Sequence, residues 1–306
     1  MATQNDFLPF ATGPGANVVD QATYAALSAL TTGFLSGTAQ STQLNKVWRQ
    51  SSIMSAVIAQ FIVAQTGQAA VDDGTTAALL ANFTNAVKAA ATGRLIGTQV
   101  FTGSGTYTPT PGMTFVIFEV QGGGASGGGA TVPSAGNVSV GSPGTAGAYA
   151  RGKFTAAQVG ASQAVTVGAG APGQTGGGGL NGGTSSVGSL ISAVGGVGGT
   201  MLNNAAAPAV NGNGNFATTV TGANLFSSSG TCASLSLALS GSIGAGAPGG
   251  SSLFGAGGYG VATNSTGTAA LNSGAGGGGV VATSAATGSL SGGAGRSGIV
   301  IAWEYA

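Results

Sequence analysis

Charged residues and histidine are almost absent from this sequence. Lysine, arginine, aspartate and glutamate together make up 4% of the 306 residues, and there is no histidine, whereas a soluble domain carries roughly 25% charged residues. The net charge is +1 and the basic residues form no run, so binding to nucleic-acid phosphates or anionic lipid is not expected. We therefore predict no nucleic-acid partner, and the composition is unusual for an enzyme.

Long hydrophobic runs are also missing. The longest apolar stretch, residues 53–64, is interrupted by Ser55 and Gln60 and is shorter than the roughly 20 residues that a membrane span requires. The beginning, MATQNDFLPFATGPG, has neither the positive charge nor the apolar core of a signal peptide. We predict no membrane insertion and synthesis in a reducing cytoplasm.

The chain has one cysteine, Cys232. One thiol cannot form an internal disulfide, and without histidine no cluster of metal ligands is expected. Cys232 lies in TCASLSLAL with no base nearby, so its thiol has no means of activation as a nucleophile. We predict that Cys232 is a small core residue, and that the protein holds no metal ion and no cofactor.

Glycine, in contrast, is abundant and unevenly placed. Of 61 glycines, residues 1–94 hold 7, residues 95–120 hold 4 and residues 121–298 hold 50. The chain therefore consists of an alanine-rich part and, from about Gly93 onward, a glycine-rich part.

The alanine-rich part shows three helical patterns. Asp20 precedes QATYAALSAL and Gly33 follows it, which predicts an N-cap, a short helix and a C-terminal stop. Ser41 opens a longer pattern that Gly67 closes, and a third helix is predicted over TTAALLANFTNAVKAA.

Apolar residues recur at three- and four-residue steps along residues 41–66, as on one face of a helix. A part of fewer than 95 residues buries too little surface to be stable alone, so we predict that copies of the chain associate through this face. An intramolecular bundle of three helices is the alternative. The predicted interface residues are Leu44, Val47, Trp48, Met54, Ile58, Phe61 and Ile62.

The glycine-rich part has the features of an ordered domain rather than a linker. Strand-like segments occur at 113–120, 148–154, 164–170 and 298–305, and the scarcity of charge is unlike that of disordered chains. Between them lie short glycine blocks such as GGGASGGG and GAGGGG. We expect these blocks to form left-handed helices of three residues per turn that pack closely and exchange N–H to C=O hydrogen bonds.

The sequence resembles a known family at both ends. PFATGPGANVVDQATYAALSAL, GFLSGTAQSTQLNKVWRQSS and MSAVIAQFI are similar to the virion-attachment part of tail fibre proteins from phages of Gram-negative bacteria. VFTGSGTYTPTPGMTFVIFEVQGGGASGGG, TVGAGAPG, GGTSSVG and GAGRSGIVIAWEYA resemble the glycine-rich domain of such fibres. Residues 201–240 depart from this pattern, because they hold only four glycines, and we expect a longer loop there.

The resemblance implies a multidomain fold: an α-helical N-terminal trimerisation region, followed by a glycine-rich domain of polyglycine II helices with a few β-strands, similar to the tip adhesin of T-even-like long tail fibres. We expect a virion-attachment segment over 1–40, a helical trimerisation stalk over 41–94 and a receptor-binding domain over 95–306.

The predicted function is that of a homotrimeric tail fibre adhesin, located in the virion tail and assembled in the host cytoplasm. Its N-terminus, around Asn5 to Asn17, would dock on an adaptor, nozzle or baseplate protein of the phage tail as an extended strap. Its other partner would be a bacterial surface polysaccharide or outer-membrane protein. A purely structural fibre or decoration protein that acts as a spacer or cap is the alternative, and an ice-binding protein is a weaker third.

Catalysis is not expected. Hydrolysis of a polysaccharide requires two convergent carboxyl groups, and the glycine-rich part offers only Glu119 and Glu304, each of which can instead pair with a basic residue. GGGASGGG follows a strand as in nucleotide-binding loops, but neither a helix-forming segment nor an acidic residue follows at the required distance.

Receptor recognition is expected in the segments between the glycine blocks, namely 131–140, 201–240, 251–272 and 280–291, because glycine itself presents no side chain. Large side chains in these segments are either binding groups or fillers between glycine runs. The candidate receptor-binding residues are Met201, Leu202, Phe216, Leu225, Phe226, Phe254 and Tyr259.

Overall fold

The computed structural model describes residues 3–37, 40–91 and 93–306. The chain divides into two compact units, Met1–Arg94 and Leu95–Ala306. The helices of the first unit are α1 (Gln21–Ala25), α2 (Ala29–Thr32), α3 (Ser41–Thr66) and α4 (Ala77–Ala90).

The ends of these helices follow local sequence signals. Asp20 caps α1, since its Oδ1 accepts a hydrogen bond of 2.8 Å from the Thr23 amide. Gly67 ends α3 in the left-handed conformation, with φ of 66°. The single helix predicted over QATYAALSAL is wrong, because the chain forms the two short helices α1 and α2 there.

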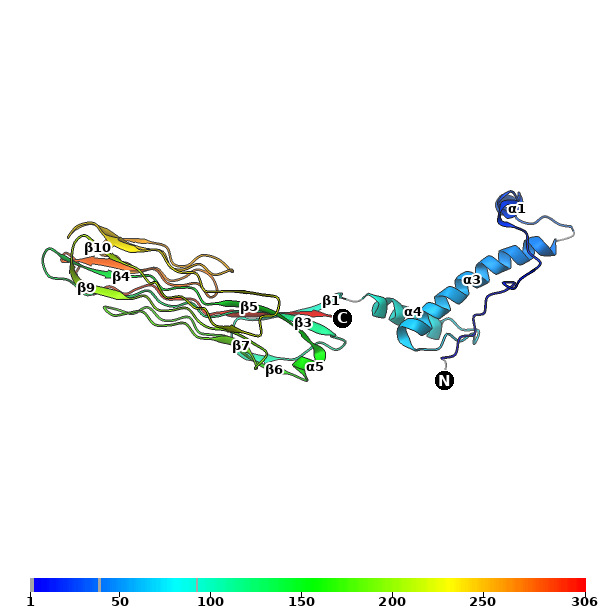
Figure 1. Ribbon diagram of the computed structural model, residues 1–306, viewed down its shortest axis with the longest axis horizontal. Coiled ribbons are helices and arrows are strands. Elements are labelled where there is room, and N and C mark those ends of the chain that lie inside the picture. Colours follow the sequence, from blue (N-terminus) through cyan, green and yellow to red (C-terminus); the bar gives the residue numbers. More distant parts are fainter. Residues whose placement is uncertain (1–2, 38–39, 92) are drawn as a thin grey trace. The chain divides into compact units, whose positions relative to one another are not determined.

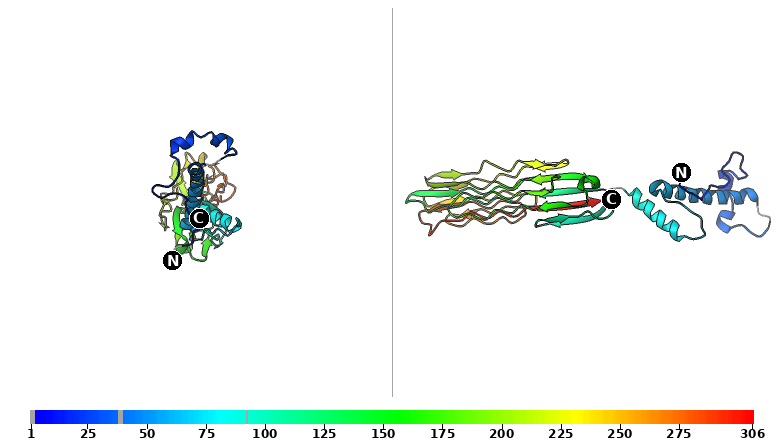
Figure 2. Two further views of the ribbon diagram at one scale, coloured as in Figure 1. Left: turned by 90° about the vertical axis from the view of Figure 1, so that its right-hand side faces the viewer. Right: turned by 90° about the horizontal axis from the view of Figure 1, so that it is seen from below.

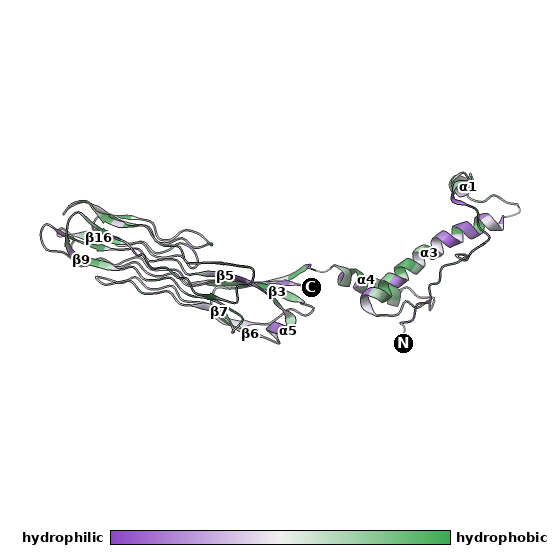
Figure 3. Ribbon diagram, in the orientation of Figure 1, coloured by the Kyte–Doolittle hydropathy of each residue, from purple (hydrophilic) through white to green (hydrophobic). Residues whose placement is uncertain are grey.

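Helices α3 and α4 pack against each other instead of forming one stalk. The rings of Phe61 on α3 and Phe83 on α4 meet edge to face at 6.4 Å, and Ile62 is fully buried. Apolar residues gather where the two helices meet (Figure 3). The prediction of a helical trimerisation stalk over 41–94 is therefore wrong: α3 and α4 fold back on each other as a helical hairpin.

The segment before α1 is extended and lies along α3. The Phe10 amide donates to Ser52 Oγ at 2.9 Å, and the Phe10 ring lies 6.1 Å from the ring of Trp48. The Asn45 side chain donates to the Asn17 carbonyl at 2.8 Å. The predicted strap is thus extended, and it is hydrogen-bonded to its own chain.

The second unit is built from strands and glycine runs (Figure 1). All its strand pairs are antiparallel, and it has one short helix, α5 (Ala156–Val159), in the part of the chain that the structure describes. The strands are β1 (Leu95–Phe101), β2 (Gly105–Tyr107), β3 (Phe115–Gln121), β4 (Asn137–Gly141), β5 (Tyr149–Thr155), β6 (Gln163–Thr166), β7 (Ser185–Val187), β8 (Ile191–Ala193), β9 (Met201–Ala206), β10 (Ala209–Asn211), β11 (Val220–Thr221), β12 (Phe226–Ser228), β13 (Ser236–Ala238), β14 (Gly244–Gly246), β15 (Val261–Ala262), β16 (Val280–Thr283) and β17 (Ile299–Tyr305).

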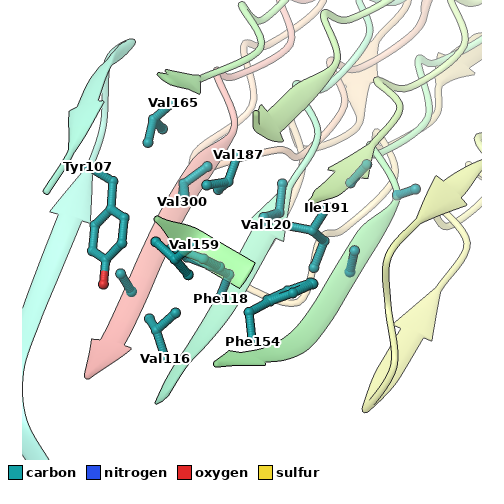
Figure 4. Packing of buried hydrophobic residues seen from close by; sticks show 14 of the residues in the cluster. Tyr107, Val116, Phe118, Val120, Phe154, Val159, Val165, Val187, Ile191 and Val300 are labelled. Carbon is teal, nitrogen blue, oxygen red and sulfur yellow. The ribbon is translucent and has the colours of Figure 1, made fainter. Parts of the chain in front are cut away.

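The strands form four sheets, two at each end of the glycine runs (Figure 2). At one end, sheet β1-β17-β3-β5-β12 faces sheet β11-β8-β7-β6-β2, and between them lies the largest apolar core, which includes Phe118, Ile191 and Val300 (Figure 4). At the other end, sheets β16-β4-β9 and β10-β13-β14-β15 enclose a smaller core around Val140 and Val281.

Hydrogen bonds between the glycine runs follow a three-residue repeat. Successive N–H groups of residues 122–130 donate in turn to segments 142–148, 177–183 and 290–296, so the same neighbour recurs at every third residue. Carbonyl groups of the same run accept from Ala171, Gly196 and Gly277, which belong to three other segments. Residues 122–130 are buried throughout, and this arrangement satisfies their backbone groups away from water.

Glycine is required in this run because neighbouring backbones approach very closely. A Cβ added to Gly124 would overlap the Ala275 carbonyl, and one added to Gly127 would overlap the Gly278 carbonyl. Two residues that do have a Cβ, Ala125 and Ser126, lie between these glycines in the sequence. The Oγ of Ser126 accepts a hydrogen bond of 2.8 Å from the Leu180 amide.

The predicted fold class is wrong in its balance of elements. The prediction was an α-helical trimerisation region followed by polyglycine II helices with a few β-strands. Helices instead make up only 18% of the described residues, and β-structure predominates, in four antiparallel sheets. The long loop predicted over residues 201–240 is also wrong, because five short strands, β9 to β13, lie in that range. These strands have two to six residues, which is too short for a clear alternation in the sequence.

Gly124→Ala is expected to destabilise the second unit by about 3 kcal/mol or more, because an added methyl group forces apart two closely packed backbones. Gly288→Ala is the matched control, since a Cβ at Gly288 meets nothing within 4 Å, and its free energy of unfolding is expected to stay within about 0.5 kcal/mol of the parent value. Denaturant unfolding of the full-length protein measures both. Equal stabilities of the two variants would contradict the close packing.

Candidate functional site

The residues predicted to mediate self-association do not form one continuous exposed face. Trp48, Met54 and Ile58 are exposed, and Ile62 is buried within the unit. The remaining three, Leu44, Val47 and Phe61, are half-buried. An apolar groove of about 280 Å³ runs between α3 and α4, lined by Ile58, Ile62, Thr76, Leu79, Leu80 and Phe83.

Two of the predicted receptor residues come together around one tyrosine of β5. The Tyr149 ring lies 6.0 Å from the ring of Phe226 and 6.3 Å from that of Phe254. Tyr149 itself is buried, while the Phe226 side chain is 52% exposed. Leu225, next to Phe226, is exposed as well. The three rings therefore form an aromatic group at the β12 edge of the first sheet.

The other predicted receptor residues lie elsewhere. Met201 and Leu202 begin β9 and pair with Gly141 and Val140, and Leu202 packs against the smaller core. Tyr259 is 63% exposed on a separate segment.

Phe216 is exposed and lines a shallow hollow with Thr231 and Cys232. Cys232 is itself exposed, so the prediction that it is a core residue is wrong. Its neighbours in TCASLSLAL led to that expectation, but they belong to the short strand β13 and the segment before it.

Sequence reasoning missed Gln121 and Tyr149, although both were in or beside predicted strands. Gln121 is the last residue of β3, Tyr149 is the first of β5, and Ser228 is the last of β12. Gln121 is paired with Tyr149 between β3 and β5, and Tyr149 is paired with Ser228 between β5 and β12. Residues paired across strands share a face of the sheet. The sequence does show a long polar side chain, Gln121, where a predicted strand meets a glycine block. The residues beside it are known only from the register of the strand pairs, which the sequence does not give.

The two carboxylates considered for catalysis are not convergent. Glu119 pairs across the ladder with Ile301, three residues before Glu304 on the same strand, so the two carboxylates point to opposite faces of the sheet. Glu119 lies 3.6 Å from Arg151 Nε. Burial, and then the nearby Glu119 carboxylate, raise the pKa of the Tyr149 hydroxyl.

Glu304 is a buried carboxylate held by neutral donors. Its Oε1 accepts from Tyr107 Oη at 2.7 Å and from the Thr110 amide at 2.9 Å, and its Oε2 accepts from Thr110 Oγ1 at 2.6 Å. Burial opposes ionisation, but these hydrogen bonds outweigh it and hold the pKa of Glu304 below its usual value. The group joins the last strand to the segments around β2.

Residues 3–37, 40–91 and 93–306 contain no group of three or more potential His, Cys, Asp or Glu metal ligands. None of the helices in these ranges has the length and hydropathy to cross a membrane. No protein-family model matches the chain, and no curated protein matches it.

Glu304→Gln is expected to destabilise the protein by about 1–3 kcal/mol at neutral pH, because an amide cannot accept all of these hydrogen bonds. The stability that the Glu304 carboxylate provides is complete above its unfolded-state pKa of about 4.3 and is lost as the pH falls through its lower folded-state pKa. Melting temperatures of both proteins between neutral and acidic pH provide the measurement. The difference between them is expected to shrink below about pH 4, and a difference independent of pH would refute this role.

Proposed function

We propose that the protein is a phage tail fibre adhesin that binds a host-cell surface receptor through the side chains between its glycine runs. The resemblance in sequence supports this reading, and so does the architecture of the second unit, in which hydrogen-bonded glycine runs hold the intervening segments in place. Such a scaffold suits recognition by preformed loops.

Exposed aromatic and apolar side chains are the observation that carries the proposal. Phe216, Leu225, Phe226 and Tyr259 are all exposed in a unit otherwise rich in Gly, Ala, Ser and Thr. Aromatic residues contribute most of the binding energy in many interfaces, and an inert spacer has no need to present them to water.

The proposal includes three partners. Copies of the chain would form a homotrimer, as the resemblance to tail fibre proteins implies. A tail adaptor, nozzle or baseplate protein would bind the N-terminal segment, where Leu8 and Phe10 are exposed. The third partner is a polysaccharide or outer-membrane protein of the host. The fibre would be assembled in the host cytoplasm and reside in the virion tail.

Binding without covalent chemistry is part of the proposal. The separation of Glu119 and Glu304 onto opposite faces supports it, because glycoside hydrolysis needs two carboxyl groups on either side of one bond.

The double variant Phe216→Ser/Phe226→Ser is expected to lose retention on host cells while its melting temperature stays close to the parent value, since both rings are exposed. Labelled full-length protein is incubated with a panel of Gram-negative strains, and the bound fraction is measured after washing. Leu180→Ser is the matched control, because Leu180 is an exposed apolar residue of the same unit outside the aromatic group. Retention by no strain, or equal retention of all three proteins, would contradict the proposal.

A further inference from the structure

Exposed aliphatic side chains gather on and beside β13. Ala238 is buried in the smaller core, whereas Leu237 and Leu239 on either side of it are exposed. Leu235, Leu239 and Ile243 are 62%, 63% and 60% exposed, which is more than the 52% of Phe226 in the aromatic group. In SLSLAL, residues 234–239, leucine therefore faces solvent at every second position.

The register of the sheet β10-β13-β14-β15 brings these side chains together. Val210 pairs with Leu237, which pairs with Ala245, and the Leu239 amide donates to the Ile243 carbonyl at 2.8 Å. Paired residues share a face of the sheet, and so do residues two apart on one strand. The aliphatic face of this sheet consists of Val210, Leu235, Leu237, Leu239 and Ile243, all exposed, and its strand β10 lies at the end of the second unit away from the C-terminus (Figure 1).

The end of the second unit that carries the aliphatic face has no charge. The charged residues of the second unit all lie in or close to strands β3, β5 and β17 of the other end, and they are Glu119, Arg151, Lys153, Arg296 and Glu304. A partner of this face is therefore neither attracted nor oriented by charge.

The composition of the aliphatic face is that of a permanent interface between identical chains. Interfaces that form and dissociate are enriched in Tyr, Trp and Arg at their centres, and none of these residues belongs to this face. Permanent homomeric interfaces are more hydrophobic and resemble a domain core cut in half. A polysaccharide fits poorly, because leucine, valine and isoleucine offer its hydroxyl groups no hydrogen bond.

The size of the face suits the centre of such an interface. Four strands about 4.8 Å apart, over five positions of about 3.4 Å each, present roughly 300 Å². A stable interface buries about 800 Å² on each partner, with a polar rim around an apolar centre. The uncharged surroundings can supply that rim, since no ion has to lose its water when a second copy packs there.

We propose that copies of this chain associate through the aliphatic face. Three such faces can meet around one symmetry axis, where the leucines of each copy are shielded from water by those of the other two. The inference rests on the proposed homotrimer and deepens it, because it places the interface on β10, β13 and the β13–β14 turn of the second unit instead of on α3.

The first test measures the mass of full-length protein in solution by light scattering. The parent is expected to have three times the mass of the chain, and Leu235→Asp/Leu239→Asp is expected to have the mass of one chain, because the new carboxylates of neighbouring copies would be buried without a counter-charge. Both substituted leucines are exposed in the single chain, and circular dichroism shows whether the variant is folded. Leu271→Asp is the matched control, since Leu271 is a leucine of the same unit that is 61% exposed outside this face, and it is expected to keep the mass of the parent.

The second test is independent of any loss of folding by the aspartate variant. Ala245→Cys places a thiol at an exposed position paired with Leu237, and Cys232→Ser removes the exposed native thiol. A short bismaleimide is expected to crosslink chains of this double variant to one another. Ala157→Cys in the same Cys232→Ser background is the control, because Ala157 is exposed on α5, and it is expected to remain uncrosslinked.

The inference is overturned if the parent is a monomer, if folded Leu235→Asp/Leu239→Asp keeps the mass of the parent, or if Ala245→Cys gives no interchain crosslink. Retention on cells, measured in parallel, separates it from the proposed function. If the aspartate variant keeps the mass of the parent but is no longer retained, the face contacts the receptor, so the inference fails and the adhesin proposal stands. If the parent assembles through this face but no strain retains it, the inference stands and the adhesin proposal fails.

Discussion

Hydrogen bonds between neighbouring glycine runs are the interaction on which the second unit depends. Each buried N–H of residues 122–130 finds a carbonyl on one of three neighbouring segments, and the repeat of three brings each neighbour back in turn. Backbones can approach this closely only where a Cβ is absent, as at Gly124. The apolar cores at the two ends are then the places where ordinary side-chain packing fixes the strands that enter and leave the runs.

The hydrogen-bonded glycine runs also fix the position of a buried polar side chain, Gln121, in this weakly charged chain. Gln121 stands at the point where β3 becomes a glycine run, and its amide is fixed by carbonyls of the run that enters β5. The pairing of β3, β5 and β12 brings Tyr149 and Ser228 to the same row. The row of Gln121, Tyr149 and Ser228 at this edge therefore depends on the register of the sheet.

Local signals in the sequence were sufficient for several elements. The helix Ser41–Thr66, closed by Gly67, is confirmed, and so are strands over most of MTFVIFEV and GIVIAWEY, because capping residues and β-branched runs act over a few residues. The fold class was wrong, since strands of two or three residues, such as β11 and β12, depend on partners far along the chain. The aromatic group was found only in part for the same reason. Phe226 and Phe254 were selected by their size, whereas Tyr149 lies beside Phe226 because β5 pairs with β12, which the sequence does not show.

Hydrogen–deuterium exchange of the full-length protein tests the central claim most directly. The measurement compares peptides that cover residues 122–130 with peptides that cover β3 and with the exposed segment 284–289. Because every N–H in the glycine run is buried and bonded, the run is predicted to exchange as slowly as β3 and far more slowly than the exposed segment. Exchange of residues 122–130 as fast as in segment 284–289 would show that the glycine runs are not held by these hydrogen bonds.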